Sequence, residues 1–149
     1  MNATAAINAY NNVSIESIVN GADPHRLILM LFQGALLEIA NAKNGILRKE
    51  TAAKGKSISR AIAIIGEGLN ASLDKSAGGE LAQNLSSLYD YMVMRLVAAN
   101  LKNDITVLDE VAGLLAELTE AWDGIRPQSM QFASQPKASA NTPRAYGRA

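Results

Sequence analysis

Apolar residues recur at steps of three and four along four long stretches of the chain, a spacing that brings them onto one face of an α-helix. These stretches lie within residues 28–46, 58–73, 80–100 and 104–125. No stretch alternates apolar and polar residues between turn signals in the way a half-buried strand does. The pattern therefore predicts an all-α fold, an antiparallel, up-and-down four-helix bundle with short connections.

Local signals mark where these helices begin and end. Asp23 suits an N-cap, and Pro24 suits the first helical position, where its missing N–H costs nothing. The stretch DKSAGG, residues 74–79, is predicted to be a turn before the third helix. Pro127 follows Ile125, the last apolar position of the fourth helix, and is expected to end that helix.

These signals divide the chain into three parts. Residues 1–22 are small and polar with scattered apolar points, and we expect them to form a short N-terminal cap segment. We expect residues 23–125 to form the bundle. Residues 126–149 contain three prolines and many small polar residues, so we expect a disordered tail.

The third and fourth helices each carry more apolar surface than one stripe requires. The main stripe of the third helix consists of Leu85, Leu88, Met92 and Leu96. Tyr91 and Met94 lie off this stripe, and the fourth helix has a second stripe that includes Val107, Val111, Leu114 and Leu118. Either these residues are core, because a helix between two neighbours buries a wide arc, or they line an exposed groove for an amphipathic segment of a partner. Helical spacing alone does not decide between the two.

Charge and composition narrow the classes of function. Residues 1–125 carry 10 basic and 14 acidic side chains, which argues against a nucleic-acid-binding protein because such proteins need a basic face. The chain has no cysteine, which excludes disulfides and thiol chemistry. Its N-terminus does not read as a secretory signal, and no apolar run is long enough to span a membrane. We therefore expect a cytoplasmic protein without membrane insertion.

Motifs for catalysis or cofactor binding are incomplete. Residues 55–57 read GKS, but Glu50 stands where a phosphate-binding loop requires glycine. Residues 66–68 read GEG without a third glycine, and inside a helix they favour a soft segment or the close approach of another backbone. His25, the single histidine, lacks partners for a metal site and is expected at the surface. The sequence therefore predicts neither an enzyme nor a cofactor or metal site.

Carboxylates are spread mainly over faces that we expect to be exposed. The carboxylates of the fourth helix are expected to be solvated, namely those of Asp109, Glu110, Glu117, Glu120 and Asp123. Asp90 lies between two tyrosines, and it either accepts a hydrogen bond from a hydroxyl or from Arg95, or is exposed with little interaction.

Three stretches of the sequence, in this order and spacing, resemble the family of flagellar export chaperones that serve flagellin, the FliS family. Tyr10 precedes the first, which reads NGADPHRLILMLFQGAL. The second reads SLDKSAGGELAQNLSSLYDYMVMRLVAAN, and the third reads VLDEVAGLLAELTEAW. Asp23, Phe32 and Gln33 depart from residues that are common in the family, and the tail after Arg126 is not expected of it.

The resemblance implies a cytoplasmic chaperone that binds the disordered C-terminal segment of flagellin in apolar grooves. Binding would prevent premature polymerisation and keep flagellin competent for flagellar type III export. In the family the N-terminal segment lies against the bundle and is displaced by cargo, a role that falls here to Tyr10 and its neighbours. The residues expected to contact a partner are Ile7, Tyr10, Tyr91, Met94, Val107, Val111, Leu114 and Leu118.

The sequence leaves the partner and the oligomeric state open. A helical adaptor or regulator that binds another flagellar or export component, such as the export gate, would use the same apolar surface. An uncovered groove could also pair with a second copy to form a homodimer. The role of the basic tail is likewise undetermined.

Overall fold

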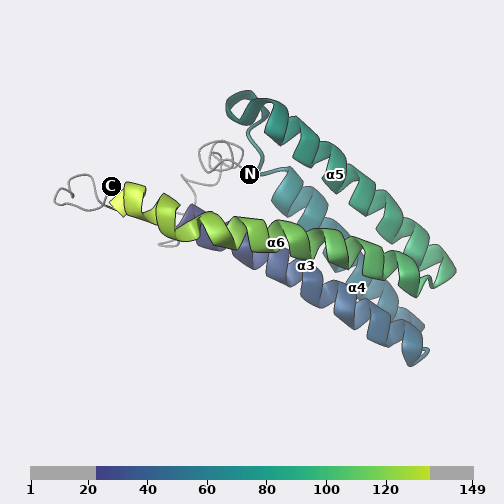
Figure 1. Ribbon diagram of the computed structural model, residues 1–149. Coiled ribbons are helices and arrows are strands. Elements are labelled where there is room, and N and C mark those ends of the chain that lie inside the picture. Colours follow the sequence, from purple (N-terminus) through teal and green to yellow (C-terminus); the bar gives the residue numbers. More distant parts are fainter. Residues whose placement is uncertain (1–22, 135–149) are drawn as a thin grey trace.

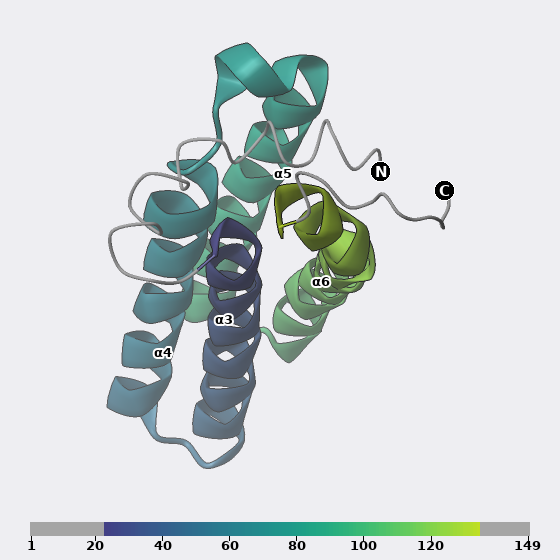
Figure 2. The ribbon, with the colours of Figure 1, turned by 90° about the vertical axis from the view of Figure 1, so that its left-hand side faces the viewer.

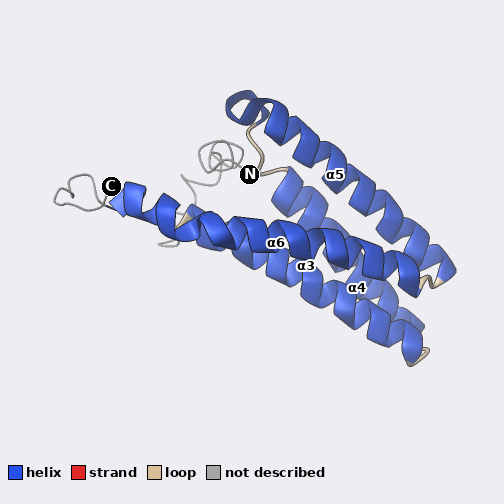
Figure 3. Cartoon of the chain, viewed as in Figure 1, coloured by secondary structure: helices blue, strands red, loops and turns tan. Residues whose placement is uncertain are grey.

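The computed structural model describes residues 23–134 and the side chains of residues 23–125. Its elements are α3 (Pro24–Leu47), α4 (Thr51–Ala63), the π-helical segment η1 (Ile64–Asn70), α5 (Lys75–Lys102) and α6 (Ile105–Ser134). Helices and short connections make up this whole range (Figures 1 and 3). The predicted all-α class is confirmed.

The helices form a four-membered, up-and-down bundle, with α4 and η1 as one continuous member. α3 lies between α4 and α6, as Figure 2 shows, and α5 packs against α6 on one side and against α4 and η1 on the other. α4 and α6 are therefore diagonal to each other, as are α3 and α5. This arrangement confirms the predicted four-helix bundle.

The core is built from the inward-facing apolar side chains of all four members of the bundle. Its large, fully buried side chains include Ile28, Ile58, Ile65, Leu69, Tyr89, Met92, Leu96, Leu108 and Leu115. All of these follow the predicted stripes except Tyr89, whose burial the spacing did not indicate. Within residues 23–134, every helix is too short or too polar to cross a lipid bilayer.

The start of α3 agrees with the sequence, but the start of α5 does not. Asp23 caps α3 by accepting a backbone N–H of its first turn at 2.7 Å. The predicted turn at residues 74–79 is wrong, because α5 begins at Lys75 with the side chain of Asp74 as its cap. Gly79 interrupts the helix with a φ of 57°, a conformation that glycine adopts without the steric cost of a Cβ. The glycines thus mark a kink within the helix.

The second helix changes to π-helical geometry from Ile64 to Asn70, a stretch that contains Gly66 and Gly68. A Cβ added at Gly68 would lie 3.1 Å from Cδ2 of Leu31. Of the two alternatives, a soft segment or the close approach of a backbone, neither describes Gly68 fully, because the close approach there is made by a side chain of α3.

α6 is longer than the sequence pattern predicts. It continues through Pro127 to Ser134, so the prediction that the helix ends at Ile125 and the tail begins at residue 126 is wrong for this stretch. Proline removes one intrahelical hydrogen bond, a cost that a helix already formed over several turns can absorb. In Figure 1 the end of α6 projects past the start of α3. The predictions for residues 1–22 and 135–149 lie outside the described residues.

His25 is buried, contrary to the prediction that it lies at the surface. Its ring stacks on Trp122 with 4.8 Å between ring centroids and 8° between planes. His25 Nε2 donates to the carbonyl oxygen of Trp122 at 2.7 Å, and Trp122 Nε1 donates to the carbonyl oxygen of His25 at 2.9 Å. This reciprocal pair joins the first turn of α3 to α6. The sequence carries no local signal for it, because the two residues are 97 positions apart.

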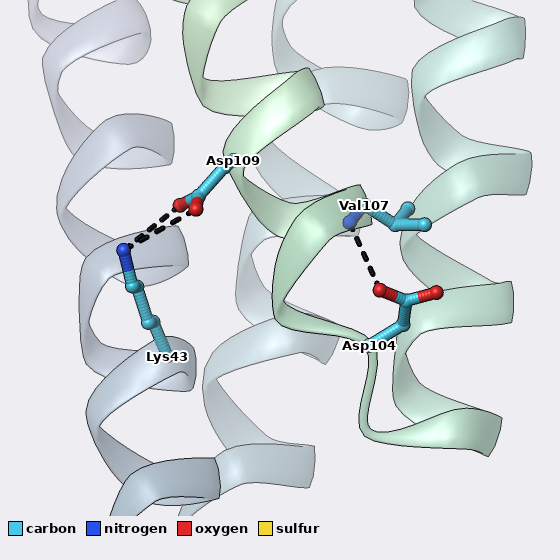
Figure 4. Close-up of polar contacts among 4 residues, drawn as sticks. All are labelled: Lys43, Asp104, Val107 and Asp109. Carbon is cyan, nitrogen blue, oxygen red and sulfur yellow. Dashed lines mark hydrogen bonds and ion pairs between the residues drawn. The ribbon is translucent and has the colours of Figure 1, made fainter.

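Polar contacts also fix the opposite end of α6. Asp104 Oδ1 accepts the backbone N–H of Val107 at 3.3 Å, which caps the helix. Lys43 Nζ lies 3.0 Å from Asp109 Oδ1 and links α3 to α6, and Figure 4 shows both contacts. Because the Lys43–Asp109 pair is exposed to solvent, it contributes little to stability.

α3 and α4 approach each other closely at Gly45. A Cβ added there would lie 3.0 Å from the backbone N and Cα of Lys54. Lys54 is itself buried, and its Nζ donates to the carbonyl of Asn100 at 2.9 Å and to Oδ1 of Asn103 at 2.7 Å. The tight approach thus places a lysine where it holds the turn between α5 and α6.

Two glycine substitutions test this close approach. Gly55→Ala should raise the free energy of unfolding by about 0.5–1 kcal/mol, because alanine is the better helix former. Gly45→Ala should lower the free energy of unfolding, although alanine is the better helix former there too. A Cβ at Gly55 meets nothing within 4 Å, whereas a Cβ at Gly45 meets the backbone of α4. Urea unfolding followed by circular dichroism measures both, and equal shifts for the two variants would contradict the close approach.

Candidate functional site

The most exposed apolar side chains of α5 form a row on its outer side. Met94 is 66% exposed, Val97 46% and Leu101 78%, and their spacing places them on one side of the helix. Tyr91 is 38% exposed and lies at the edge of this side towards α6. These four residues are called the α5 apolar row below. Of the two alternatives for Tyr91 and Met94, burial in the core or exposure at the surface, the second is therefore correct.

The second stripe of α6 is divided between core and surface. Val107 and Val111 are buried, against the expectation that they face an open groove. Leu114 and Leu118 are half-buried and pack against the edge of the core. The reason is the position of α6 between α3 and α5, which buries a wider arc than one neighbour would.

A polar cluster ties α5 to α6 beside the apolar row. Glu110 accepts hydrogen bonds from the hydroxyl of Tyr91 and, at 2.9 Å, from Nε of Arg95. The guanidinium of Arg95 also lies 6.0 Å from the centre of the Tyr91 ring. The expectation that Glu110 is merely solvated is therefore wrong.

Asp90 accepts a hydrogen bond at 3.0 Å from the side-chain amide of Asn70 in η1, rather than from a hydroxyl or from Arg95.

The protonation of this cluster is fixed by its own hydrogen bonds. The hydrogen bond from Tyr91, followed by that from Arg95, lowers the pKa of the Glu110 carboxyl. The same bonds raise the pKa of the Tyr91 hydroxyl and the pKa of Arg95. At neutral pH the cluster therefore consists of a neutral tyrosine, a carboxylate and a guanidinium. This combination is the one in which every hydrogen bond can form.

Exposed apolar residues on α3 form a separate feature. Met30 and Leu37 are 53% and 60% exposed and lie on the outer side of α3, diagonally across the bundle from α5. The sequence reasoning missed these two residues and Val97. The seven-residue step from Met30 to Leu37, and the three-residue step from Met94 to Val97, are signals that could have revealed them.

The described residues include exposed apolar side chains on α5. They contain no group of three His, Cys, Asp or Glu side chains placed to hold a metal ion. Residues 55–57 lie inside α4, so they do not form a phosphate-binding loop. The α5 apolar row, with Leu114 and Leu118 on α6, can contact the apolar face of another protein segment. Ile7 and Tyr10, also predicted to contact a partner, lie outside the described residues.

Comparison with known proteins shows extended similarity to flagellar proteins. A model of the family described as flagellar protein FliS matches residues 6–129. The flagellar secretion chaperone FliS of Salmonella typhimurium is 48% identical over 129 residues, which cover 87% of this chain and 96% of the relative. FliSB of Pseudomonas aeruginosa, with the same descriptive name, is 50% identical over 84% of this chain and 98% of the relative. The FliS of Escherichia coli is 41% identical over 82% of this chain and 90% of the relative.

The lowered pKa of Glu110 makes its contribution to stability depend on pH. Because the folded state favours the carboxylate, this contribution is complete above the pKa of an unfolded glutamate, about 4.3, and is lost as the pH falls through the lower folded pKa. The wild type should therefore melt at a higher temperature than Glu110→Gln at neutral pH, and this difference should shrink in acid. Thermal unfolding followed by circular dichroism from neutral to acidic pH measures the difference.

Asp123→Asn is the matched control for this measurement. Asp123 is exposed on the same helix and takes part in none of the ion pairs within the described residues. Its removal should change the melting temperature little and without this dependence on pH. A constant difference between the wild type and Glu110→Gln across the whole range would show that the cluster does not stabilise the fold as a charged group.

Proposed function

Because the chain belongs to the FliS family of flagellar proteins, we propose that it is a flagellar secretion chaperone whose cargo is flagellin. It binds the disordered C-terminal segment of flagellin on apolar surface contributed by α5 and α6. Binding prevents premature polymerisation and keeps the subunit competent for export. The function is that of a binding protein in the cytoplasm and involves no catalysis.

The observation that carries this proposal is the α5 apolar row. Single exposed apolar residues are common on protein surfaces, but a contiguous group of large ones on one helix face is typical of an interaction site. Met94 adds a flexible, polarisable side chain, which adapts to different apolar partners. Leu114 and Leu118 continue apolar surface on the neighbouring helix α6. Such a surface fits an amphipathic helix that presents apolar residues at steps of three and four.

The hydrogen bonds around Glu110 support the proposal because they fix the spacing of the two helices. Tyr91 and Arg95 on α5 both bind this one carboxylate on α6. A cargo segment that is disordered before binding must lose conformational entropy when it becomes helical. A binding surface that is already ordered loses little conformational entropy of its own. More of the interaction energy then contributes to affinity.

The N-terminal segment has a part in this proposal. Ile7 and Tyr10 cover apolar surface while no cargo is bound and are displaced when flagellin arrives. Covering of this kind limits aggregation through exposed apolar side chains. Contacts with the export gate and with other flagellar proteins follow once the cargo is held.

A pair of methionine substitutions tests the proposed surface. Met94→Asp should weaken the binding of flagellin roughly tenfold or more, because the new carboxylate loses water where the methionine made apolar contacts. Met30→Asp introduces the same change at an exposed methionine on α3 and should leave the affinity nearly unchanged. Isothermal titration with monomeric flagellin measures both variants, and circular dichroism checks that each is folded.

Flagellin without its C-terminal segment provides the second control. It should not bind the wild-type chaperone, and light scattering of each sample separates cargo binding from pairing of the chaperone with itself. Unchanged binding of the truncated flagellin would reject the proposed cargo segment. Equal affinities of Met94→Asp and the wild type would reject the α5 apolar row as the site. If neither form of flagellin binds, a helical adaptor for another export component becomes the better account.

A further inference from the structure

α6 presents an unpartnered face that is partly apolar and strongly acidic. Residues 104–125 contain six acidic residues and no basic one, whereas residues 23–63 contain seven basic residues and three acidic ones. Glu117 and Glu120 are exposed, and within the described part of the chain no ion pair or hydrogen bond holds their carboxylates. This face therefore attracts a positively charged occupant.

The apolar part of the same face lies next to these carboxylates. Leu114 and Leu118 are half-buried, and Ala121 is exposed. Leu114 precedes Glu117 by three positions and Ala121 follows it by four, so all three lie on neighbouring turns of one side of the helix. The α6 strip is the name used below for five residues of this side: Leu114, Glu117, Leu118, Glu120 and Ala121. An occupant that matches the strip combines cations with an apolar or aromatic group.

The segment that follows the described residues has this composition. Residues 135–149 contain Lys137, Arg144 and Arg148 and no acidic residue, and Tyr146 lies between the two arginines. The family match ends at residue 129, so the segment is an addition to the part of the chain that the family accounts for. The other segment outside the described range, residues 1–22, contains one acidic residue and no lysine or arginine. Charge therefore favours the C-terminal segment as the occupant of the strip.

The segment is long enough to reach the strip. Glu117 lies 17 positions before Ser134, the last described residue, which corresponds to about 25 Å along a helix. Arg144 follows Ser134 by 10 positions, and an extended chain of that length spans up to roughly 33 Å. The chain can therefore turn back after Ser134 and bring its arginines beside the acidic residues of α6.

We propose that residues 135–149 dock on the α6 strip of their own chain. Arg144 and Arg148 pair with Glu117 and Glu120, and the ring of Tyr146 packs on the apolar side chains beside them. Exposed pairs of this kind are individually weak and are screened by salt, so the contact is reversible. The contact is internal to one chain, and its test requires no flagellin.

Paramagnetic labelling of the full-length chain tests the contact directly. The chain has no cysteine, so Ala121→Cys provides a single attachment site for a nitroxide on the strip. Ser59→Cys provides a matched exposed site on α4, diagonally across the bundle. Amide resonances of residues 144–148 should broaden with the label at position 121 and stay sharp with the label at position 59. The broadening should fall severalfold in 1 M salt, where the screening length is about 3 Å.

Further samples make the outcome decisive. Replacing both Glu117 and Glu120 with Gln, in the chain labelled at position 121, should reduce the broadening as salt does. Equal broadening from both labelling sites, or none from either, would overturn the proposal. So would broadening confined to residues 7–19, which would place the N-terminal segment on the strip. Broadening of an isotope-labelled chain by a separate spin-labelled chain would show that the occupant is a second copy, which also contradicts the proposal.

Discussion

The packing of α6 against two helices at once decides which apolar side chains are core and which remain exposed. Facing α3 and α5 together, α6 buries Val107 and Val111 in addition to Leu108 and Leu115. Trp122 holds the far part of the helix to α3 through its stacking and reciprocal hydrogen bonds with His25. The second stripe of α6 is thus largely used by the fold. What remains for a partner is the outer side of α5 and the edge of α6.

The exposed side of α5 depends on this arrangement. Met92 and Leu96 are buried on its inner side, and the hydrogen bonds of Tyr91 with Glu110 fix its edge to α6. The helix therefore cannot rotate to bury Met94 without losing core contacts. A stable apolar surface that the fold cannot cover with its own core is a physical basis for a chaperone that holds an unfolded cargo segment.

The fold could be predicted from local signals, whereas the site could be predicted only in part. Asp23 and the apolar spacing mark the helices because capping and amphipathicity depend on near neighbours in the sequence. Rotation of each helix depends on its neighbours in space, so the spacing could not decide that Met94 is exposed and Val111 is buried. The burial of His25 rests on a contact across 97 positions, and no local pattern encodes it. In place of the turn predicted at residues 74–79, the glycines produce a kink at Gly79 inside α5.

The central claim, that cargo binds the outer side of α5 and the edge of α6, is tested most directly by radical footprinting of the methionines. Met94 and Met30 are both exposed and lie on diagonal helices, while Met92 is buried and serves as an internal reference. When the C-terminal segment of flagellin is added, oxidation of Met94, measured by mass spectrometry, should slow severalfold, while Met30 and Met92 react as before. Protection of Met30 with Met94 unchanged, or no protection of either, would contradict the account.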